Sequence, residues 1–403
     1  MSVITSPVGR YETVAVSGSS RISPIPPENA CSTESMRKLY IEPTTRCNLN
    51  CKMCFRQTWV DEPFCDMPDE VFTKALETLP GTVEKIFFGG MGEPLCHPDI
   101  LSMLRRAKAT GRFVEVITNG TLLTDEFCEA LIDTGIDRLW ISVDDLQLNH
   151  GENFQGHIAH SAAYVERFHR HRLDRRSRNL PEPLLGITFV ATKSNVAQLK
   201  DLPNFINAYA INDVNISNIL PADKASIRER LYDRVLEREL FCSQNSSGRV
   251  RIELPYADWN IPDFRDAAAG MMDMMAEVSM GGTLLRRRTG WCRFIEEGCC
   301  FVRPDGHVSP CMGLLHSTKT WLYSDERTVW HHSFGTLPAQ SLPEVWNSPE
   351  YTAFRDRVHR FTFSPCTHCG GCEFRTENRS DCFGNPEPTC GGCLWSEGII
   401  TCP

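Results

Sequence analysis

Three cysteines with uneven spacing carry the clearest chemical signal in this sequence. In "EPTTRCNLNCKMC", three residues separate Cys47 from Cys51 and two separate Cys51 from Cys54. A loop of this length can turn three thiolates onto one metal cluster. Because a cubane iron–sulfur cluster has four irons, three cysteine ligands leave one iron open to a substrate or cofactor, whereas an electron carrier normally has four. A structural zinc site that takes its fourth ligand from elsewhere is the alternative.

A second group of cysteines crowds the last part of the chain. The sequence has 19 cysteines, of which residues 292–403 contain 11 and residues 1–291 only 8. In a long chain without an evident secretory signal, clustered thiols indicate metal binding or redox chemistry rather than a disulfide scaffold. Two tetrathiolate clusters would need eight ligands, although C-x2-C pairs also occur in zinc ribbons. The candidate ligands are Cys292, Cys299, Cys311, Cys366, Cys369, Cys372, Cys382, Cys390, Cys393 and Cys402, with Cys300 as an alternative to Cys299.

A repeated strand–helix pattern predicts the elements that position the first cysteine group. Short apolar segments rich in β-branched and aromatic residues are typical of parallel strands covered by helices. The expected strands are Lys38–Glu42, Glu84–Phe88, Phe113–Ile117, Arg138–Val143, Leu185–Ala191 and Asp213–Ile219, and helical patterns lie between them. This predicts an α/β fold, a partial (β/α)6 TIM-like barrel. Its reactive groups should lie at the carboxyl ends of the strands, where the loop of Cys47 begins.

Further polar and glycine-rich segments follow successive strands. "FFGGMGEP" contains Gly90, Gly92 and Glu93, and the glycines allow close approach of the backbone. "ITNG" (117–120), "ISVDD" (141–145) and "ATKSN" (191–195) end the next three strands. Each segment alone is a weak signal, since Asn-Gly is often only a turn. Their order at successive strand ends makes them jointly informative.

The C-x3-C-x2-C pattern after the first strand of a partial barrel resembles the signature of the radical S-adenosylmethionine (SAM) superfamily. The resemblance implies a [4Fe–4S] cluster held by Cys47, Cys51 and Cys54, with SAM chelating the open iron. It also implies that an electron from the cluster cleaves SAM to a 5′-deoxyadenosyl radical, which abstracts hydrogen from a substrate. The cofactor contacts that it implies are Gly90, Gly92 and Glu93 in a Gly-Gly-Glu motif with one inserted residue, Ser142 and Asp144 near the ribose, and Lys193 at the SAM carboxylate. No catalytic acid or base is evident, and Asp145 is a candidate by position only.

The start of the cysteine-rich region, "RPDGHVSPC", resembles the SPASM extension of peptide- and protein-modifying radical SAM enzymes. That resemblance implies one or two auxiliary [4Fe–4S] clusters. The expected ligands of the first are Cys292, Cys299 or Cys300, Cys311 and a distant cysteine, Cys382. The expected ligands of the second are Cys366, Cys369, Cys372 and one cysteine of the tail.

The final segment, "DCFGNPEPTCGGCLWSEGIITCP", resembles the subgroup of maturases for tungsten-containing aldehyde ferredoxin oxidoreductases. The implied activity is modification of a protein or its cofactor. The implied partners are a protein or peptide substrate, such as a tungsten–pterin oxidoreductase, and an electron donor such as ferredoxin or flavodoxin. A ribosomal-peptide or sulfatase-type modifying enzyme is the alternative within the same chemistry. A zinc-stabilised binding protein is the alternative from another class.

Composition sets the remaining expectations. The net charge is −9 with no block of like charges, which argues against a nucleic-acid partner bound through bulk basicity. No stretch approaches a membrane helix, and the first residues lack the apolar core of a secretory signal, so we expect a cytoplasmic protein. The expected organisation is a flexible tail at 1–36, a radical SAM core at 37–222, a helical linker at 223–290 that includes a Met-rich helix at 270–282, and a small SPASM-like domain at 291–403.

Overall fold

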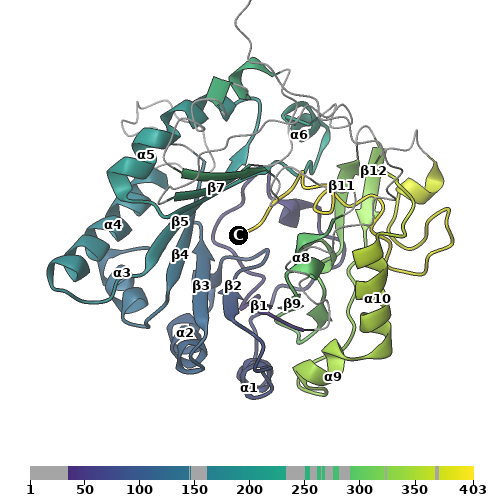
Figure 1. The fold of residues 1–403 in the computed structure, drawn as a ribbon, viewed down its shortest axis with the longest axis horizontal. Coiled ribbons are helices and arrows are strands. Elements are labelled where there is room, and N and C mark those ends of the chain that lie inside the picture. The colour runs from purple at the N-terminus through teal and green to yellow at the C-terminus, as the bar shows by residue number, and fades with distance from the viewer. Residues whose placement is uncertain are drawn as a thin grey trace, which may run out of the picture. The chain divides into compact units, whose positions relative to one another are not determined.

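A mostly parallel sheet organises the fold in a computed structural model of the chain (Figure 1). Ten strands are hydrogen-bonded in the order β10-β9-β1-β2-β3-β4-β5-β6-β7-β8, and β11 pairs with β12 separately. The structure describes residues 35–144, 146, 161–232, 250–254, 261–264, 266–267, 276–280, 291–322, 325–367 and 372–403. Within these residues β8 and β10 are the two edges of the sheet, so the barrel is open.

The first six strands follow the chain order and are parallel, which places all their carboxyl ends at one edge. The strands are β1 (Lys38–Ile41), β2 (Lys85–Phe88), β3 (Phe113–Thr118), β4 (Arg138–Val143), β5 (Leu184–Ala191), β6 (Asp213–Asn218), β7 (Val250–Leu254), β8 (Ala276–Met280), β9 (Cys299–Val302), β10 (Val308–Ser309), β11 (Thr318–Leu322) and β12 (Asp325–Val329). The predicted α/β fold with a partial barrel of six strand–helix units is confirmed, since each predicted strand agrees with the structure to within one residue at each end.

Helices line the outer side of the parallel strands in Figure 1. The structure also describes α6 (Lys224–Arg228), α8 (Arg293–Glu296), α9 (Leu342–Trp346) and α10 (Pro349–Arg360) later in the chain. The helices along the parallel strands are α1 (Asp69–Glu77), α2 (Ile100–Ala109), α3 (Asp125–Ile132), α4 (Ser161–Ser177) and α5 (Leu202–Tyr209). Helix α2 shows why they pack there: Ile100, Met103, Leu104 and Ala107 are buried and share one face of the helix. The Thr124 side chain caps α3 by accepting a hydrogen bond from the Phe127 N–H.

Two strands correct the expectation of a helical linker at 223–290. Strand β7 pairs in parallel with β6, and β8 pairs in parallel with β7, so both extend the core sheet. Residues 276–280 of the Met-rich piece belong to β8, where we had expected a helix. The segments "VRIEL" and "AEVSM" are five residues each, and runs this short do not separate strand from helix by periodicity. Residues 1–34 of the predicted tail (1–36) are not among the residues that the structure describes.

The cysteine-rich region is built onto the core sheet and shares it. Strand β9 pairs in parallel with β1 on the side opposite β2, and β10 pairs with β9 as an antiparallel edge. Cys299 and Cys300 are therefore strand residues beside Lys38 and Leu39. The region expected to begin at residue 291 is thus continuous with the barrel through its sheet.

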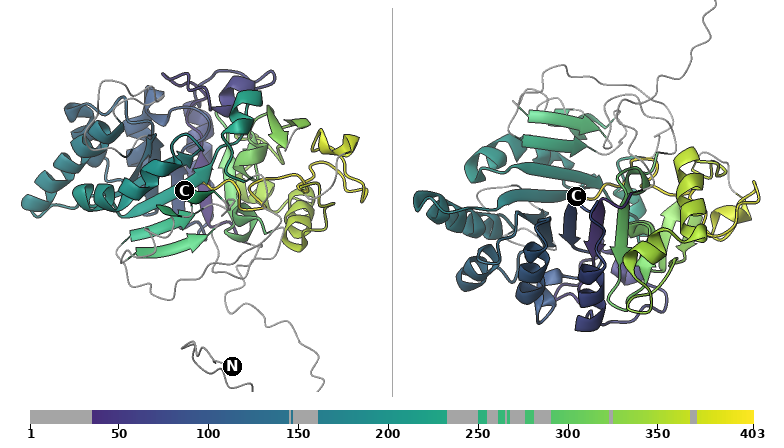
Figure 2. Two further views of the ribbon diagram at one scale, coloured as in Figure 1. Left: turned by 90° about the horizontal axis from the view of Figure 1, so that it is seen from above. Right: turned by 60° about the horizontal axis from the view of Figure 1, so that its bottom comes forward.

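The last residues of the chain lie against the barrel strands, as the views in Figures 1 and 2 show. The Asn218 side-chain amide donates to the Ile399 carbonyl at 2.8 Å, and the Thr401 hydroxyl donates to the Ile216 carbonyl at 2.9 Å. At the other end of the segment, the Pro403 oxygen accepts from Tyr40 Oη at 2.7 Å. Residues 399–403 therefore connect β6 to β1 across the open barrel.

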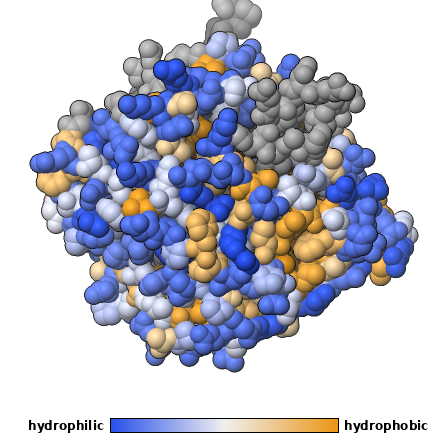
Figure 3. Space-filling view, turned by 180° about the vertical axis from the view of Figure 1, so that it is seen from behind, coloured by the Kyte–Doolittle hydropathy of each residue, from blue (hydrophilic) through white to orange (hydrophobic). Residues whose placement is uncertain are grey.

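The molecular face seen in Figure 3 is largely hydrophilic, and its apolar residues gather mainly near the middle. Phe64 and Phe383 are the most exposed large apolar side chains of the described residues, at 65% each. Isolated apolar side chains of this kind are ordinary on protein surfaces. None of the helices that the structure describes has the length and apolar character needed to cross a membrane.

Asn218 gives a direct test of the contact between β6 and the last residues. Replacing it in Asn218→Ala leaves the buried Ile399 carbonyl without its donor, which should lower the free energy of unfolding by about 1–3 kcal/mol. Denaturant unfolding under anaerobic conditions measures this change. The exposed Asn204 of α5 provides the control, because Asn204→Ala should change the free energy of unfolding by no more than about 0.5 kcal/mol. Equal effects of the two substitutions would contradict the docking of residues 399–403.

Candidate functional site

The cysteine loop and the end of β2 meet through a backbone contact at Gly92. A Cβ atom on Gly92 would lie 2.1 Å from the Thr44 carbonyl oxygen and 2.8 Å from that of Arg46. The next residue, Glu93, donates its backbone N–H to the Arg46 carbonyl at 2.8 Å. Gly92 therefore makes room for the chain immediately before Cys47. The close approach predicted for this glycine is to the protein's own backbone.

Glu93 presents a buried carboxylate next to this contact. Its Oε1 accepts hydrogen bonds from Thr118 Oγ1 at 2.7 Å and the Leu95 N–H at 3.1 Å, and its Oε2 accepts one from the Asn119 N–H at 2.7 Å. Burial raises the pKa of Glu93 to about 7, although these three donors oppose the shift. Within the described residues no cationic side chain pairs with it. A ligand ammonium would supply the missing positive charge, so the site fits a cationic group.

Asn119 connects Glu93 to the cysteine loop and was not singled out from the sequence. Its Nδ2 donates to Asn48 Oδ1 at 3.0 Å and lies 3.8 Å from Cys47 Sγ. Its Oδ1 accepts hydrogen bonds from the backbone and hydroxyl of Thr121. The segment "ITNG" was noted as a strand end, but its Asn-Gly pair reads equally well as a turn. The position after β3, next to β2, was the signal that could have identified it.

The thiols of Cys47, Cys51 and Cys54 lie near one another at the carboxyl end of β1. Burial raises the pKa of Cys51 to about 11, and the negative charges of Asp144, Cys54 and Cys47 add to that effect. The pKa of Cys54 is raised by burial as well. The Leu49 N–H donates to Cys47 Sγ at 3.4 Å. Ionising all three thiols would accumulate negative charge that a metal cluster can neutralise, so this donor set fits one. No three His, Cys, Asp or Glu side chains in the described part of the chain are close enough to hold a single ion.

The other predicted cofactor contacts lie at neighbouring strand ends. Gly90 packs on Glu42, because a Cβ there would be 2.5 Å from the Glu42 side chain. Ser142 of β4 accepts a hydrogen bond from Thr188 of β5 at 3.1 Å. Asp144 lies within electrostatic reach of Cys51, as described above. Lys193 is exposed just beyond β5, and its backbone N–H donates to the Glu229 carbonyl. Asp145 lies outside the described residues.

Four of the eleven C-terminal cysteines gather into one group. The thiols of Cys292, Cys311, Cys390 and Cys393 lie close together: burial raises the pKa of the first three, and the charges of neighbouring thiols in the group add to that effect. Burial and the Cys393 charge raise the pKa of Cys292 to about 12. Backbone N–H groups two and three positions further on donate to the sulfur atoms of Cys292, Cys311 and Cys393. Such donors favour the thiolate form, so these residues fit an iron–sulfur cluster. We call them the four-thiol group.

This arrangement brings together other thiols than the ligand pairing expected from the sequence, and that pairing stays a prediction. Cys390 and Cys393, not Cys382, lie with Cys292 and Cys311, because the final turn of the chain folds back onto the start of the cysteine-rich region. The remaining described cysteines of this region have other surroundings. Cys299 lies beside Lys38, Arg293 and Glu297, and Cys300 lies beside Arg355 and Tyr351. Cys366 Sγ is 3.2 Å from Ser364 Oγ, Cys402 accepts a hydrogen bond from Trp395 Nε1, and Cys372 and Cys382 are exposed. Cys369 lies outside the described residues.

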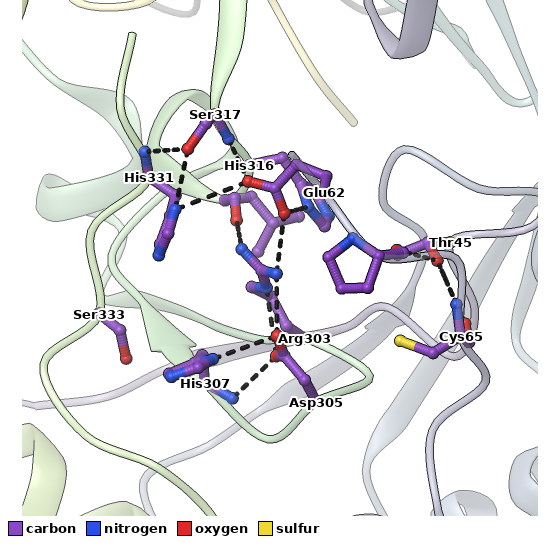
Figure 4. A network of polar contacts seen from close by, with 12 residues as sticks. Thr45, Glu62, Cys65, Arg303, Asp305, His307, His316, Ser317, His331 and Ser333 are labelled. Atoms are coloured by element: carbon purple, nitrogen blue, oxygen red, sulfur yellow. Dashed lines mark hydrogen bonds and ion pairs between the residues drawn. The ribbon is translucent and has the colours of Figure 1, made fainter. Parts of the chain in front are cut away.

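A buried network of charges joins the cysteine-rich region to the end of β1 through Glu42; Figure 4 shows its part around Glu62, Arg303 and His316. His316 is fully buried, and its two ring nitrogens contact Glu42 Oε2 at 2.6 Å and Glu62 Oε2 at 2.9 Å. Glu62 also pairs with Arg303 at 2.9 Å. At the other end, Glu42 Oε1 accepts a hydrogen bond from the Met91 N–H at 2.6 Å, inside the glycine-rich segment. The network therefore anchors the backbone that leads to Glu93.

The two carboxylates favour the charged form of His316. Burial alone would lower its pKa, but Glu42 and Glu62 raise the pKa of His316 to about 9. Burial alone would raise the pKa of Glu62, yet hydrogen bonds from His316 and the Ser317 N–H hold that pKa at about 2. Trp59 stacks on the imidazole with ring centroids 4.6 Å apart. The imidazolium is thus the form that this site stabilises.

Comparisons with known proteins place these features in a family context. The model of the radical SAM superfamily matches residues 41–176, and that of the SPASM iron–sulfur cluster-binding domain matches residues 292–373. The chain is 32% identical to the tungsten-containing aldehyde ferredoxin oxidoreductase cofactor-modifying protein of Pyrococcus furiosus, over 91% of this chain and 97% of that protein. It is also 32% identical to the AdoMet-dependent heme synthase of Methanosarcina barkeri, over 89% and 97%.

Solved structures give the same fold at lower identity. The structure of Streptococcus suis SuiB bound to precursor peptide SuiA matches with a TM-score of 0.53 and 16% identity, over 84% of this chain and 70% of that one. This likeness shows the fold alone. Together with the family matches, it confirms the resemblance that the cysteine spacing indicated.

The pH dependence of stability tests the charge on His316. The pKa of His316 is about 9 in the folded chain and about 6.5 in the unfolded chain. Its protonation therefore stabilises the fold fully below pH 6.5, and this contribution is lost as the pH rises through about 9. The loss of unfolding free energy in His316→Gln should therefore be largest at pH 6 and shrink toward pH 9.5. Anaerobic denaturant titrations across this range measure it. The exposed Asn204 provides the control, because Asn204→Ala removes no titratable group and should show no such trend. A pH-independent loss in His316→Gln would contradict the assignment.

Proposed function

Because this chain belongs to the radical SAM superfamily and carries a SPASM iron–sulfur domain, we propose that Cys47, Cys51 and Cys54 hold its SAM-binding [4Fe–4S] cluster. The observation that carries this proposal is the convergence of the three thiols at the carboxyl end of β1, beside Glu93 and Asn119. Three cysteine ligands leave one iron for SAM. When bound, the cluster and SAM would supply the 5′-deoxyadenosyl radical.

The protein's own part is to orient SAM and keep it in place. We assign Glu93 to the SAM ammonium, since its buried carboxylate has three hydrogen-bond donors and no cationic partner within the described residues. Ser142 and Asp144 are assigned to the ribose from their places at the end of β4. Gly90 and Gly92 act indirectly, because they seat the glycine-rich segment on Glu42 and Thr44. The assignment of Lys193 to the SAM carboxylate stays a prediction.

We assign one auxiliary [4Fe–4S] cluster to the four-thiol group. Its support is the burial of the four cysteines and the backbone donors that face their sulfur atoms. A second auxiliary cluster on Cys366, Cys369 and Cys372 stays a prediction. The auxiliary sites would relay electrons or anchor substrate, with ferredoxin or flavodoxin as the external donor. We propose that the protein works in the cytoplasm.

The substrate that we propose is a tungsten–pterin oxidoreductase or its cofactor. The Pyrococcus furiosus relative bears a name of that kind, and its similarity spans almost the full length of both chains. The second candidate is a ribosomal peptide or a sulfatase-type protein substrate. It is favoured by the likeness in fold to SuiB, which was solved with a precursor peptide. Membership in the superfamily argues against a zinc-stabilised binding protein.

Removing the three thiols tests the cluster assignment. A chain with Cys47, Cys51 and Cys54 all replaced by Ala should lose the iron of one cluster and form no 5′-deoxyadenosine from SAM and dithionite, because no open iron remains. Chromatography of the nucleoside and iron and sulfide counts measure both effects. The buried Cys128 of α3 provides the matched control, and Cys128→Ala should retain cleavage. Cleavage by the triple variant would refute the assignment.

Production of a tungsten oxidoreductase with and without this protein tests the proposed substrate. Without it, or with the triple variant in its place, the oxidoreductase should lack activity or complete cofactor, because the modification is missing. Activity assays and cofactor analysis of the purified oxidoreductase measure the outcome. Full activity in its absence would remove this substrate while leaving SAM cleavage untouched. Deuterium transfer from a labelled peptide to 5′-deoxyadenosine would then favour the second candidate.

A further inference from the structure

Arg327 of β12 is a buried cation that has no carboxylate partner among the described residues. It is 4% exposed, and within the residues that the structure describes its Nε and Nη1 atoms have no hydrogen-bond partner. Burial lowers the pKa of Arg327, and the charges of Cys366, Cys393 and Cys390 oppose that effect. A buried guanidinium whose donors stay unpaired is strongly unfavourable. An anionic group near the neighbouring thiols would supply the hydrogen-bond acceptors that these nitrogen atoms lack.

The segment that carries two of those thiols is shaped around Arg327. A Cβ atom on Gly392 would collide with the guanidinium, and one on Gly391 would collide with the Ser364 carbonyl. The two glycines between Cys390 and Cys393 thus let the backbone pass between Ser364 and Arg327. Because a Cβ on Gly392 would meet the guanidinium itself, Arg327 lies directly against the loop of the four-thiol group.

The pocket around Arg327 completes this arrangement. It is lined by Cys311, Cys390 and Cys393 together with apolar side chains such as Leu394 and Trp395. Apolar walls leave a charge in the pocket weakly screened, so a nearby fixed cation acts strongly on it. Arg327 is the cation that faces these three thiols in this pocket.

We propose that Arg327 is the built-in counter-ion of the auxiliary cluster on the four-thiol group and raises its reduction potential. The inference rests on the cluster assignment proposed above. Reduction takes one electron from an external low-potential donor and adds one negative charge to the cluster, with no bond made or broken. A fixed cation with two free donors stabilises the more negative, reduced state. Arg327 thus acts through its charge on the cluster and makes or breaks no bond itself.

A redox titration of the full-length, anaerobically reconstituted protein tests this role. In Arg327→Met, which keeps most of the volume but removes the charge, the midpoint of one auxiliary cluster should become more negative by at least 59 mV, a tenfold change in the one-electron equilibrium. Arg327→Lys should recover part of the shift. The exposed Arg379 stacks on Trp330 in the same region, and Arg379→Met is the charge-matched control, expected to leave the midpoint unchanged. Titration monitored by electron paramagnetic resonance and iron counts provide the readouts.

The outcomes separate the two levels of the proposal. An unchanged midpoint in Arg327→Met with full iron content would overturn the role of Arg327 and leave the cluster assignment standing. Iron loss in Arg327→Met that Arg327→Lys restores would support the role, since the charge would then be needed to hold the cluster. Equal iron loss in both variants would overturn it in favour of packing. A wild-type protein that holds zinc and no auxiliary iron would overturn the cluster assignment and the inference together.

Discussion

The contact between Gly92 and the Thr44 carbonyl is the constraint on which the site depends. Strands β1 and β2 are neighbours in the sheet, so the chains leaving them must pass each other at the same edge. They do so with no room for a side chain at Gly92, which brings Cys47 and Glu93 to one place. A thiolate donor and a buried carboxylate are thereby held together by backbone packing, before any ligand contributes.

The two cysteine-rich parts of the chain form one structure with the barrel. Strand β9 continues the barrel sheet beside β1, and His316 binds the carboxylate of Glu42 at the end of β1. Buried cations occur at two places in this region. The imidazolium ring of His316 offsets the negative charges of Glu42 and Glu62. The guanidinium of Arg327 faces thiols, which become negatively charged when they lose their protons. Buried opposite charges hold this region to the barrel.

The sequence allowed the barrel and the first cysteine group to be predicted, because both depend on local patterns. Apolar runs mark the strands, and the spacing of Cys47, Cys51 and Cys54 fixes their loop. The four-thiol group could not be predicted for a physical reason: Cys390 and Cys393 approach Cys292 through a return of the chain that no short-range pattern encodes. The sequence marked Asn119 only as part of an ordinary Asn-Gly turn, since its partners come from the end of β2 and from the cysteine loop.

The place of residues 399–403 has a consequence for biosynthesis. Asn218 of β6 finds its partner, Ile399, 181 positions later in the chain. The strands of the barrel leave the ribosome in order and can begin pairing early, whereas this contact forms only when synthesis has passed residue 399. Cys390 and Cys393 emerge equally late. The four-thiol group can therefore come together only on a chain whose barrel strands β1 to β6 have already been synthesised.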